Sequence, residues 1–235
     1  MPSGGRASRG PMRGTRLAHE EATMSGWARD QVPVTRVYER VAPIYDAYDG
    51  AMDLMGGTAR RRRLVSRARG SVLEVGIGTG RNLPQYPVDV ALTGIDVSGR
   101  MLERARRRAS VLQRDVELLE ADVHSLPFAA GSFDTVVATC VFCSVADPAR
   151  GLAEVRRVVK RGGVVLLLEH VRPDGAVLGW LADIVTPLTR RLFGPAMNRR
   201  TEVTVARVGL EAVTVRREAI WREIVCRPGA VTARA

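Results

Sequence analysis

A glycine-rich turn directly after an apolar run constrains the fold of this chain more than any other feature. The apolar run 72–75 leads into Gly76, Gly78 and Gly80, and a helix-like segment follows. This layout is typical of the first strand of a parallel α/β sheet, which presents a nucleotide-like ligand at its carboxyl edge. A dinucleotide-binding pattern G-x-G-x-x-G would need glycine at position 81, where the chain has Arg81. The turn therefore differs from the dinucleotide fingerprint.

Apolar segments recur along the chain and predict the order of the sheet. The second predicted strand ends at Asp96, whose carboxylate can accept hydrogen bonds from both hydroxyls of a ribose. Ser98 and Asp147 are suitable helix N-caps, and Gly162 with Gly163 is predicted to end the second of these two helices. The predicted strands after the first are 90–95, 116–120, 135–139, 164–168, 210–216 and 220–227, and further helices are expected from 81 and over 201–208. The sequence thus predicts an α/β domain that ends in a pair of strands.

The composition is that of an ordinary globular protein with a basic surface. The 235 residues are 46% hydrophobic and 26% charged, which suits one α/β domain with a tail. The apolar runs are shorter than the roughly 18–20 residues that span a bilayer. The net charge of +11 favours anionic partners such as nucleic acid, anionic lipid or acidic substrates, unless the arginines only decorate solvated helices. The three cysteines form no disulfide-like framework, so we expect a cytoplasmic protein.

The N-terminal part of the chain is expected to lie outside the sheet. Residues 1–31 are rich in Gly, Ser, Arg and Pro and are predicted to form a disordered tail. Met24 is a plausible alternative start, so we expect residues 1–23 to be dispensable. Residues 32–70 are predicted to form a helical cap that contains the arginines 60–63. These arginines lie either on an anionic membrane or at a solvated helix end.

A second unusual segment interrupts the predicted ligand-binding domain, 71–235. Residues 174–200 are too apolar for a simple surface loop and too short to span a membrane. They are expected to form either a lid over an acceptor site or a patch that enters the lipid interface beside basic residues. The protein is accordingly expected to be cytoplasmic and, in the second case, peripheral to a membrane.

Four motifs together resemble one branch of methyltransferases. They are Glu74-Val75-Gly76-Ile77-Gly78-Thr79-Gly80, Gly94-Ile95-Asp96-Val97-Ser98, Asp122-Val123-His124-Ser125-Leu126-Pro127-Phe128 and Leu166-Leu167-Leu168-Glu169-His170-Val171-Arg172. In this order they are similar to the class I S-adenosylmethionine (SAM)-dependent methyltransferases, in particular to bacterial phosphatidylethanolamine N-methyltransferases and ubiquinone- and menaquinone-type methyltransferases. The resemblance implies a Rossmann-like, seven-stranded, mostly parallel sheet with a C-terminal antiparallel hairpin and helices on both faces.

The resemblance also implies which residues bind SAM. They are Glu74, Gly76, Gly78, Gly80, Asp96, Val97, Asp122 and Val123. The turn would approach the methionine moiety and the ribose, and Asp96 would accept from the ribose hydroxyls. Asp122 would accept from the adenine amino group, and the backbone N–H of Val123 would meet the ring. His124 is expected to face solvent.

The expected chemistry follows from the cofactor that the resemblance implies. SAM carries its own electrophile, so no metal is expected. An acceptor amine arrives protonated, and Tyr45 and His170, with Asp46, are the candidate catalytic residues for removing the proton. In the related families the N-terminal helix covers the cofactor and its tyrosine approaches the active centre, so Tyr38 is a further candidate. Alternatively, the tyrosines belong to an ordinary amphipathic cap, and His170 is a strand-end residue bonded to the backbone.

Two cysteines raise a separate question about zinc. Cys140 and Cys143 have the C-x-x-C spacing of a redox pair or half a zinc site. A second Cys/His pair with ligand spacing does not accompany them in the sequence. We therefore expect Cys140 to be a small residue that lines the pocket.

The methyl acceptor stays open at this stage. The preferred acceptor is an amphiphilic amine such as phosphatidylethanolamine, methylated at an anionic membrane surface. The alternative is O-, S- or C-methylation of a hydrophobic small molecule such as a quinone or a specialised metabolite. A nicotinamide-dependent oxidoreductase would share the sheet and Asp96, but the glycine spacing opposes it. A nucleic-acid-binding protein would explain the charge of +11, yet the sequence contains no aromatic platform or recognition module, and no specific nucleic acid is expected.

Overall fold

The computed structural model describes residues 36–40, 50, 56–173, 175–192, 195–196 and 198–229. All of them belong to the unit Pro33–Ala235. The predicted tail, 1–31, lies outside the described residues, and so does Tyr45. Of the predicted cap, the structure describes a short helical segment at 36–40, residue 50 and the chain from position 56 onward.

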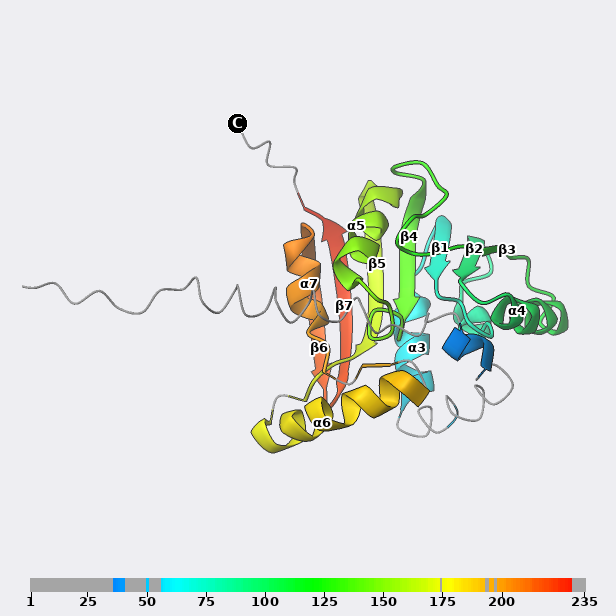
Figure 1. Ribbon diagram of the computed structural model, residues 1–235. Coiled ribbons are helices and arrows are strands. Elements are labelled where there is room, and N and C mark those ends of the chain that lie inside the picture. The colour runs from blue at the N-terminus through cyan, green and yellow to red at the C-terminus, as the bar shows by residue number, and fades with distance from the viewer. Residues whose placement is uncertain are drawn as a thin grey trace, which may run out of the picture. The chain divides into compact units, whose positions relative to one another are not determined.

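A seven-stranded sheet forms the centre of this unit, in the order β3-β2-β1-β4-β5-β7-β6 (Figure 1). Its strands are β1 (Ser71–Val75), β2 (Ala91–Asp96), β3 (Glu117–Glu120), β4 (Phe133–Thr139), β5 (Val159–His170), β6 (Leu210–Glu218) and β7 (Trp221–Pro228). Neighbouring strands from β3 to β5 are parallel, whereas β7 runs antiparallel to both β5 and β6. The predicted mostly parallel sheet with a C-terminal antiparallel hairpin is confirmed.

Helices pack on both faces of the sheet. They are α3 (Gly57–Val65), α4 (Gly99–Val111), α5 (Pro148–Val158) and α7 (Thr201–Arg207), with a 3₁₀ turn η1 (Leu83–Gln85), while α6 (Ala176–Leu192) follows β5. Along β5, Val165 and Leu167 pack in one core cluster with α5 and α7, and Leu166 and Leu168 pack in another with α3 and α4. Both faces of β5 are therefore buried, which explains its uninterrupted apolar sequence.

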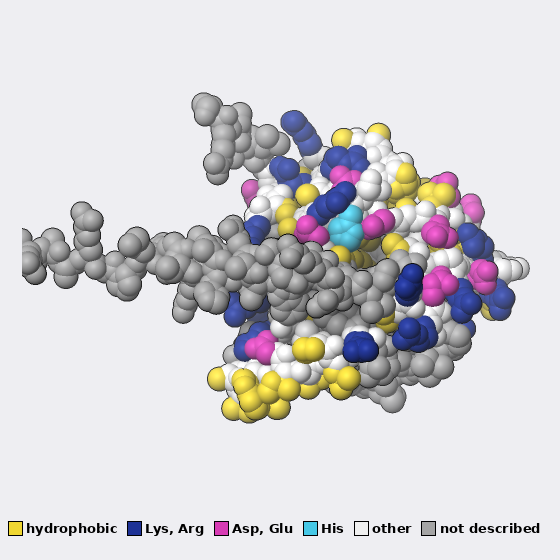
Figure 2. All heavy atoms as spheres, viewed as in Figure 1, with side chains coloured by type: hydrophobic (Ala, Val, Ile, Leu, Met, Phe, Trp, Pro, Cys, Tyr) yellow, Lys and Arg dark blue, Asp and Glu magenta, His cyan; other side chains and the backbone are white. Residues whose placement is uncertain are grey.

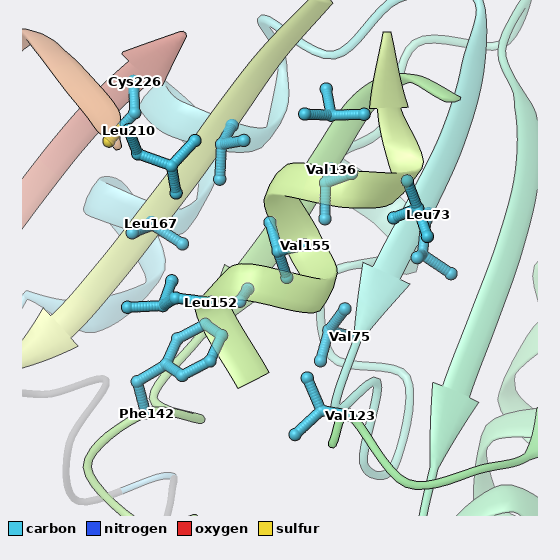
Figure 3. Packing of buried hydrophobic residues seen from close by; sticks show 14 of the residues in the cluster. Leu73, Val75, Val123, Val136, Phe142, Leu152, Val155, Leu167, Leu210 and Cys226 are labelled. Carbon is cyan, nitrogen blue, oxygen red and sulfur yellow. The ribbon is translucent and has the colours of Figure 1, made fainter. Parts of the chain in front are cut away.

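One of these two cores lies between α5 and the sheet. Leu152 and Val155 of α5 point toward Leu73, Val136 and Leu167 of the strands (Figure 3). All five side chains are fully buried. Burying a leucine or valine side chain stabilises a fold by about 1.5–3 kcal/mol, so this layer fixes the strands whose ends form the site described below.

The predicted helix starts are confirmed. The Ser98 hydroxyl accepts a hydrogen bond from the backbone N–H of Met101 at 3.3 Å, which caps α4. The Asp147 carboxylate accepts from the N–H groups of Ala149 and Arg150, each at 3.0 Å, which caps α5. The buried face of α4 consists of Met101, Leu102, Ala105 and Ala109.

Two local predictions are wrong. Gly162 and Gly163 do not end a helix, because α5 ends at Val158 and β5 already begins at the next residue. A Cβ at position 163 would lie 2.8 Å from the carbonyl oxygen of Asp134, so this glycine allows a close backbone approach at a β-irregularity. The helix expected from residue 81 is reduced to the 3₁₀ turn Leu83–Gln85.

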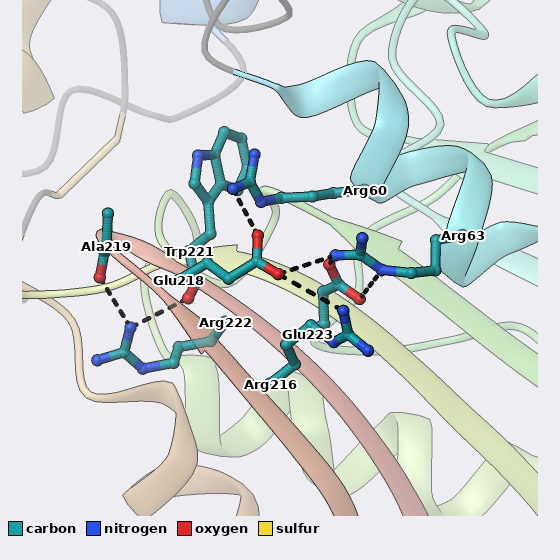
Figure 4. Close-up of polar contacts among 8 residues, drawn as sticks. All are labelled: Arg60, Arg63, Arg216, Glu218, Ala219, Trp221, Arg222 and Glu223. Atoms are coloured by element: carbon teal, nitrogen blue, oxygen red, sulfur yellow. Dashed lines mark hydrogen bonds and ion pairs between the residues drawn. The ribbon is translucent and has the colours of Figure 1, made fainter.

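Arg60 and Arg63 of α3 face the terminal hairpin (Figure 4). Arg60 donates to Glu218 at 2.6 Å and lies over the ring of Trp221, 5.6 Å from its centroid. Arg63 binds Glu223 and also reaches Glu218 at 3.3 Å. Half-exposed ion pairs of this kind contribute about 0–1 kcal/mol each, so their main effect is to orient α3 against β6 and β7. These two arginines therefore pair with carboxylates of the same chain, an arrangement that the sequence did not predict.

Candidate cofactor and acceptor site

A pocket of about 580 Å³, counting its open mouth, lies at the carboxyl edge of the sheet. Its walls come from the ends of β1, β2 and β4, from the segments that follow β1 to β4, and from Tyr38. Of the predicted cofactor residues, the lining includes Gly76, Gly78, Asp96, Val97 and Val123. The lining does not include Glu74, Gly80 or Asp122. The sequence motifs thus converge on one pocket, with some members behind its wall.

The glycine turn has a left-handed backbone at three positions. Gly76, Gly78 and Gly80 have φ of 64°, 57° and 78°. A Cβ at Gly76 would overlap the side chain of Val141, and one at Gly80 would overlap Leu83. At Gly78 a Cβ would meet nothing within 4 Å. Gly76 and Gly80 therefore allow the turn to pack, while Gly78 leaves its backbone open to a ligand.

Asp96 closes the pocket at the end of β2. One carboxylate oxygen accepts from the backbone N–H of Gly78 at 2.9 Å, and the other accepts from that of Ser98 at 3.0 Å. Burial raises the pKa of Asp96 to about 6, against the opposing effect of these backbone hydrogen bonds. Each oxygen can accept a second hydrogen bond. Asp96 therefore has acceptor capacity left for a ligand, and its role toward a ribose stays a prediction.

Glu74 lies behind the turn rather than in the pocket. Its carboxylate accepts from the side-chain amide of Asn82 at 2.7 Å and from the hydroxyl of Tyr86 at 2.9 Å. Burial raises the pKa of Glu74 to about 7. In this structure Glu74 therefore supports the turn from its buried side.

A buried arginine of α3 joins the same network. Arg61 donates to the Thr139 hydroxyl at 2.7 Å and to the Asn82 amide oxygen at 3.3 Å, and Thr139 lines the pocket. The sequence analysis treated Arg61 as one member of a surface cluster. Its helical spacing to Leu64 and Val65, which are buried beside it, is the signal that places it on the inner face of α3.

The segment after β3 brings one of its two predicted residues to the pocket. Val123 is buried and lines the pocket. Asp122 is exposed and accepts from the backbone N–H of His124 at 2.9 Å and from its ring Nδ1 at 2.6 Å. The other ring nitrogen, Nε2, accepts from the backbone N–H of Asp147 at 3.2 Å. His124 remains partly exposed, and its ring links two loops.

A buried carboxylate shapes the loop after β4. Glu169 accepts hydrogen bonds from three successive backbone N–H groups, those of Val141, Phe142 and Cys143, at 2.9–3.1 Å. Burial raises the pKa of Glu169 to about 7. Cys140, where the loop begins, has a left-handed φ of 58° and lines the pocket. Glu169 belongs to one of the four sequence motifs, but the sequence alone predicted no role for it.

His170 is buried next to this loop. Its ring packs against that of Trp221 at a tilt of 53°, with 4.0 Å between the ring centroids, and Nε2 lies 4.0 Å from the sulfur of Cys140. Burial, with a contribution from the charge of Arg61, lowers the pKa of His170 to about 4. The residue contacts a pocket-lining side chain but is not itself part of the lining. Its neutral ring can accept or donate a hydrogen bond, and its catalytic role stays a prediction.

The short helix at 36–40 touches both rims of the pocket. The Tyr38 hydroxyl donates to the Ser144 hydroxyl at 2.7 Å, and both residues line the pocket. The Ser98 hydroxyl donates to Glu39 at 2.9 Å, and Arg100 pairs with Glu39 at 3.3 Å. This helix therefore connects the start of α4 with the loop after β4.

Cys140 and Cys143 can be placed within this geometry. Both are free, and the sulfur of Cys143 donates to the carbonyl oxygen of Cys140 at 3.3 Å. Across the part of the chain that the structure describes, no group of three His, Cys, Asp or Glu side chains is arranged to hold a metal ion. The prediction that Cys140 lines the pocket is confirmed.

These features fit a nucleoside with an amino-acid group attached. Asp96 offers a carboxylate to ribose hydroxyls, Val97 and Val123 offer apolar contact to a base, and the open backbone at Gly78 admits the remainder. The sequence matches the family described as methyltransferase domain over residues 73–167. It is also 37% identical over 179 residues to a phosphatidylethanolamine N-methyltransferase of Cereibacter sphaeroides, a match that covers 74% of this chain and 84% of that protein. The chain belongs to the SAM-dependent methyltransferases.

Other comparisons agree with this assignment. The methyltransferase is 35% identical over 184 residues to a demethylmenaquinone methyltransferase of Renibacterium salmoninarum, covering 75% of this chain and 74% of that protein. Among solved structures, it is similar to a SAM-dependent methyltransferase of Thermotoga maritima described as a possible histamine N-methyltransferase. That match has a TM-score of 0.65 at 22% identity and covers 83% of this chain and 100% of that one. The cofactor of the enzyme is accordingly SAM.

Proposed function

We propose that this methyltransferase methylates the amine nitrogen of an amphiphilic phospholipid, such as phosphatidylethanolamine, at a membrane surface. The relative from Cereibacter sphaeroides is named for phosphatidylethanolamine. The observation that carries the proposal is an exposed apolar helix, α6, whose following segment is hydrogen-bonded to the wall of the cofactor pocket.

The outer face of α6 is unusually apolar. Its large hydrophobic side chains are 42–71% exposed: Val177, Leu178, Trp180, Leu181, Ile184, Val185 and Leu188. Figure 2 shows hydrophobic side chains gathered along this helix. Exposed patches of this kind mark interaction surfaces, and a helix with one apolar face suits the boundary between headgroups and acyl chains. Within the described residues, none of the helices has the length and hydrophobicity to cross a membrane.

The segment that follows α6 is bound to the pocket wall. The backbone N–H of Ala196 donates to the carbonyl oxygen of Cys143 at 2.8 Å. The Arg199 guanidinium donates to the carbonyl oxygen of Val145 at 2.9 Å, and Val145 lines the pocket. A lipid held against α6 would thus present its headgroup close to the cofactor. This arrangement supports the role of residues 174–200 as an acceptor element.

The chemistry requires alignment and the loss of a proton from the acceptor. SAM, when bound, supplies an electrophilic methyl group. Asp96 and the glycine turn hold the cofactor, and the loop fixed by Glu169 forms the wall on the acceptor side, so the chain contributes mainly positioning. An ammonium with a pKa of roughly 10 would lose its proton to His170 only against a difference of several pKa units. If His170→Gln leaves turnover unchanged, the catalytic role of His170 is excluded.

Quinone C-methylation is the second candidate. The similarity to the demethylmenaquinone methyltransferase is almost as high, and a prenylated quinone would also fit an enzyme that docks on lipid through α6. The two candidates differ in the charge of the acceptor, because phosphatidylethanolamine carries a phosphodiester and an ammonium group and the quinone carries neither.

The test is methyl transfer from labelled SAM to a total membrane lipid extract, followed by separation of the products. The proposal expects label in mono-, di- or trimethylated phosphatidylethanolamine. Label in the quinone fraction would favour the second candidate, and label only outside the lipids would exclude both. A mock reaction with the Asp96→Asn protein controls for contaminating methyltransferases, because this variant should bind SAM weakly.

A further inference from the structure

Three arginines gather where the chain returns from α6 to the carboxyl edge of β5. The backbone N–H of Arg172 donates to the carbonyl oxygen of Arg199 at 3.1 Å. The Arg172 guanidinium binds Asp183 of α6 through both Nε and Nη2, the latter at 3.0 Å. Arg200 follows directly and is exposed. We call Arg172, Arg199 and Arg200 the edge arginines.

The edge arginines leave an uncompensated positive charge. Asp183 is the single acidic residue of α6, and among the edge arginines Arg172 binds its carboxylate while Arg200 acts on it through its charge. The hydrogen bond from Arg172 lowers the pKa of Asp183, and the charge of Arg200 contributes. Asp183 therefore stays ionised at physiological pH, and the four side chains together carry about two net positive charges. This is a suitable environment for a phosphate-type anion.

The position of the edge arginines matches the layout of an amine-bearing phospholipid. On one side, the Arg172 guanidinium lies so close to Gly179 of α6 that a Cβ there would overlap it. On the other side, Arg199 holds the carbonyl oxygen of Val145 in the pocket wall at 2.9 Å. Apolar helix, arginines and methyl-donor pocket thus follow one another in space. Acyl chains, phosphodiester and amine follow one another in the lipid.

We propose that the edge arginines bind the phosphodiester of the methyl acceptor, with Arg199 and Arg200 as its donors and Arg172 as their support. This inference rests on the proposed function and specifies its substrate class as an amine that carries a phosphodiester. Arginine suits this role because its planar fork donates two parallel hydrogen bonds to phosphate oxygens. A neutral quinone offers no such group, so these residues would select the phospholipid.

Arg200→Gln is the most informative variant. The side chain of Arg200 is exposed and makes no capping hydrogen bond to α7, so its replacement should leave the fold intact. Arg161→Gln is the matched control, because Arg161 is also exposed but lies near the beginning of β5, at the opposite end of the strand. The melting temperature with and without SAM checks that both variants keep the cofactor pocket.

The assay compares two acceptors in phosphatidylcholine vesicles: phosphatidylethanolamine and a long-chain primary alkylamine without phosphate. For Arg200→Gln, the ratio of kcat/KM for the phospholipid to that for the alkylamine should fall about tenfold, through KM for the phospholipid. Arg161→Gln should leave the ratio unchanged. Soluble glycerophosphoethanolamine shows whether the arginines bind the headgroup itself or only a membrane surface. If they bind the headgroup, this compound should react with a higher KM than phosphatidylethanolamine, and its KM should rise further in Arg200→Gln.

The outcomes separate the inference from the proposed function. If the wild type methylates phosphatidylethanolamine and Arg200→Gln leaves both the ratio and KM unchanged, the phosphodiester site is excluded while the proposed function stands. If the wild type methylates no lipid amine, the proposed function itself fails. The inference is also supported if the wild type does not methylate the alkylamine and Arg200→Gln has a higher KM for phosphatidylethanolamine than the wild type.

Discussion

The two ends of the active site are built in different ways. The cofactor end consists of strand termini, backbone N–H groups and carboxylates that are held by several hydrogen bonds, as at Asp96. The acceptor end that we propose consists of α6, with its exposed apolar side chains, and the edge arginines. The first is a preorganised site for one fixed ligand. The second is a surface that can be altered without disturbing the sheet, which explains how relatives with one cofactor act on different acceptors.

The largest expected effect lies at the cofactor end. In Asp96→Asn the amide NH₂ would face the backbone N–H of either Gly78 or Ser98, and the charge that serves the ribose hydroxyls would be lost. A hydrogen bond to a charged group contributes about 1.5–3 kcal/mol, so SAM affinity should fall about 100-fold. Isothermal titration with SAM measures the change. The exposed turn residue Asp89 provides the control Asp89→Asn, and equal affinity in both variants would contradict the assigned role.

The second effect concerns the support behind the turn. Because burial raises the pKa of Glu74 from its ordinary 4.5 to about 7, Glu74 favours the folded state fully below pH 4.5, and this contribution is lost as the pH rises toward 7. In Glu74→Gln, the side chain at position 74 is neutral at every pH. When the pH rises from 5 to 8, the free energy of unfolding of this variant should therefore fall by about 2–3 kcal/mol less than that of the wild type. Urea unfolding at several pH values measures this difference. Parallel curves for the two proteins would contradict it, and Glu103→Gln, at an exposed position, is the control.

The third effect belongs to the acceptor end alone. Trp180→Asp places a charge in the apolar face of α6, so binding to vesicles should weaken at least tenfold while SAM affinity stays the same. Vesicle sedimentation measures the partition. Val88 is another highly exposed hydrophobic residue, located before β2, and Val88→Asp should leave vesicle binding unchanged. Similar losses in both variants would mean that α6 has no special part in membrane contact.

The smallest expected effect lies at the junction of the two ends. Tyr38→Phe removes the hydrogen bond to Ser144 across the pocket but keeps the ring. One such hydrogen bond contributes about 0.5–1.5 kcal/mol, so SAM should dissociate about threefold faster. Stopped-flow displacement of SAM measures the rate. A rate equal to that of the wild type would show that the short helix at 36–40 does not retain the cofactor.

The sequence predicts the cofactor end better than the acceptor end, for physical reasons. Strand, glycine turn and helix cap are local features, so the positions of Gly76, Asp96 and Ser98 follow from the pattern around each residue. The roles of Arg61 and Glu169 were not predicted, because their hydrogen-bond partners are remote in sequence. Arg61 binds a side-chain hydroxyl and a side-chain amide, and Glu169 binds backbone N–H groups.

The same limit applies to contacts outside the pocket. The pairing of Arg60 and Arg63 with carboxylates of the hairpin depends on a contact between segments more than 150 residues apart. Local sequence could show only that these arginines are charged. The exposed face of α6, in contrast, was visible as an apolar segment, but its attachment to the pocket wall through Ala196 required the fold.

The central claim is that the acceptor end of this methyltransferase selects a phospholipid amine at a membrane surface. The direct measurement is a one-pot competition in defined vesicles that contain equal amounts of phosphatidylethanolamine and demethylmenaquinone, with labelled SAM as the donor. We expect label in the phospholipid amine, with most of that signal lost in Trp180→Asp. Label in the quinone, or label in the phospholipid that is unaffected by Trp180→Asp, would contradict this claim.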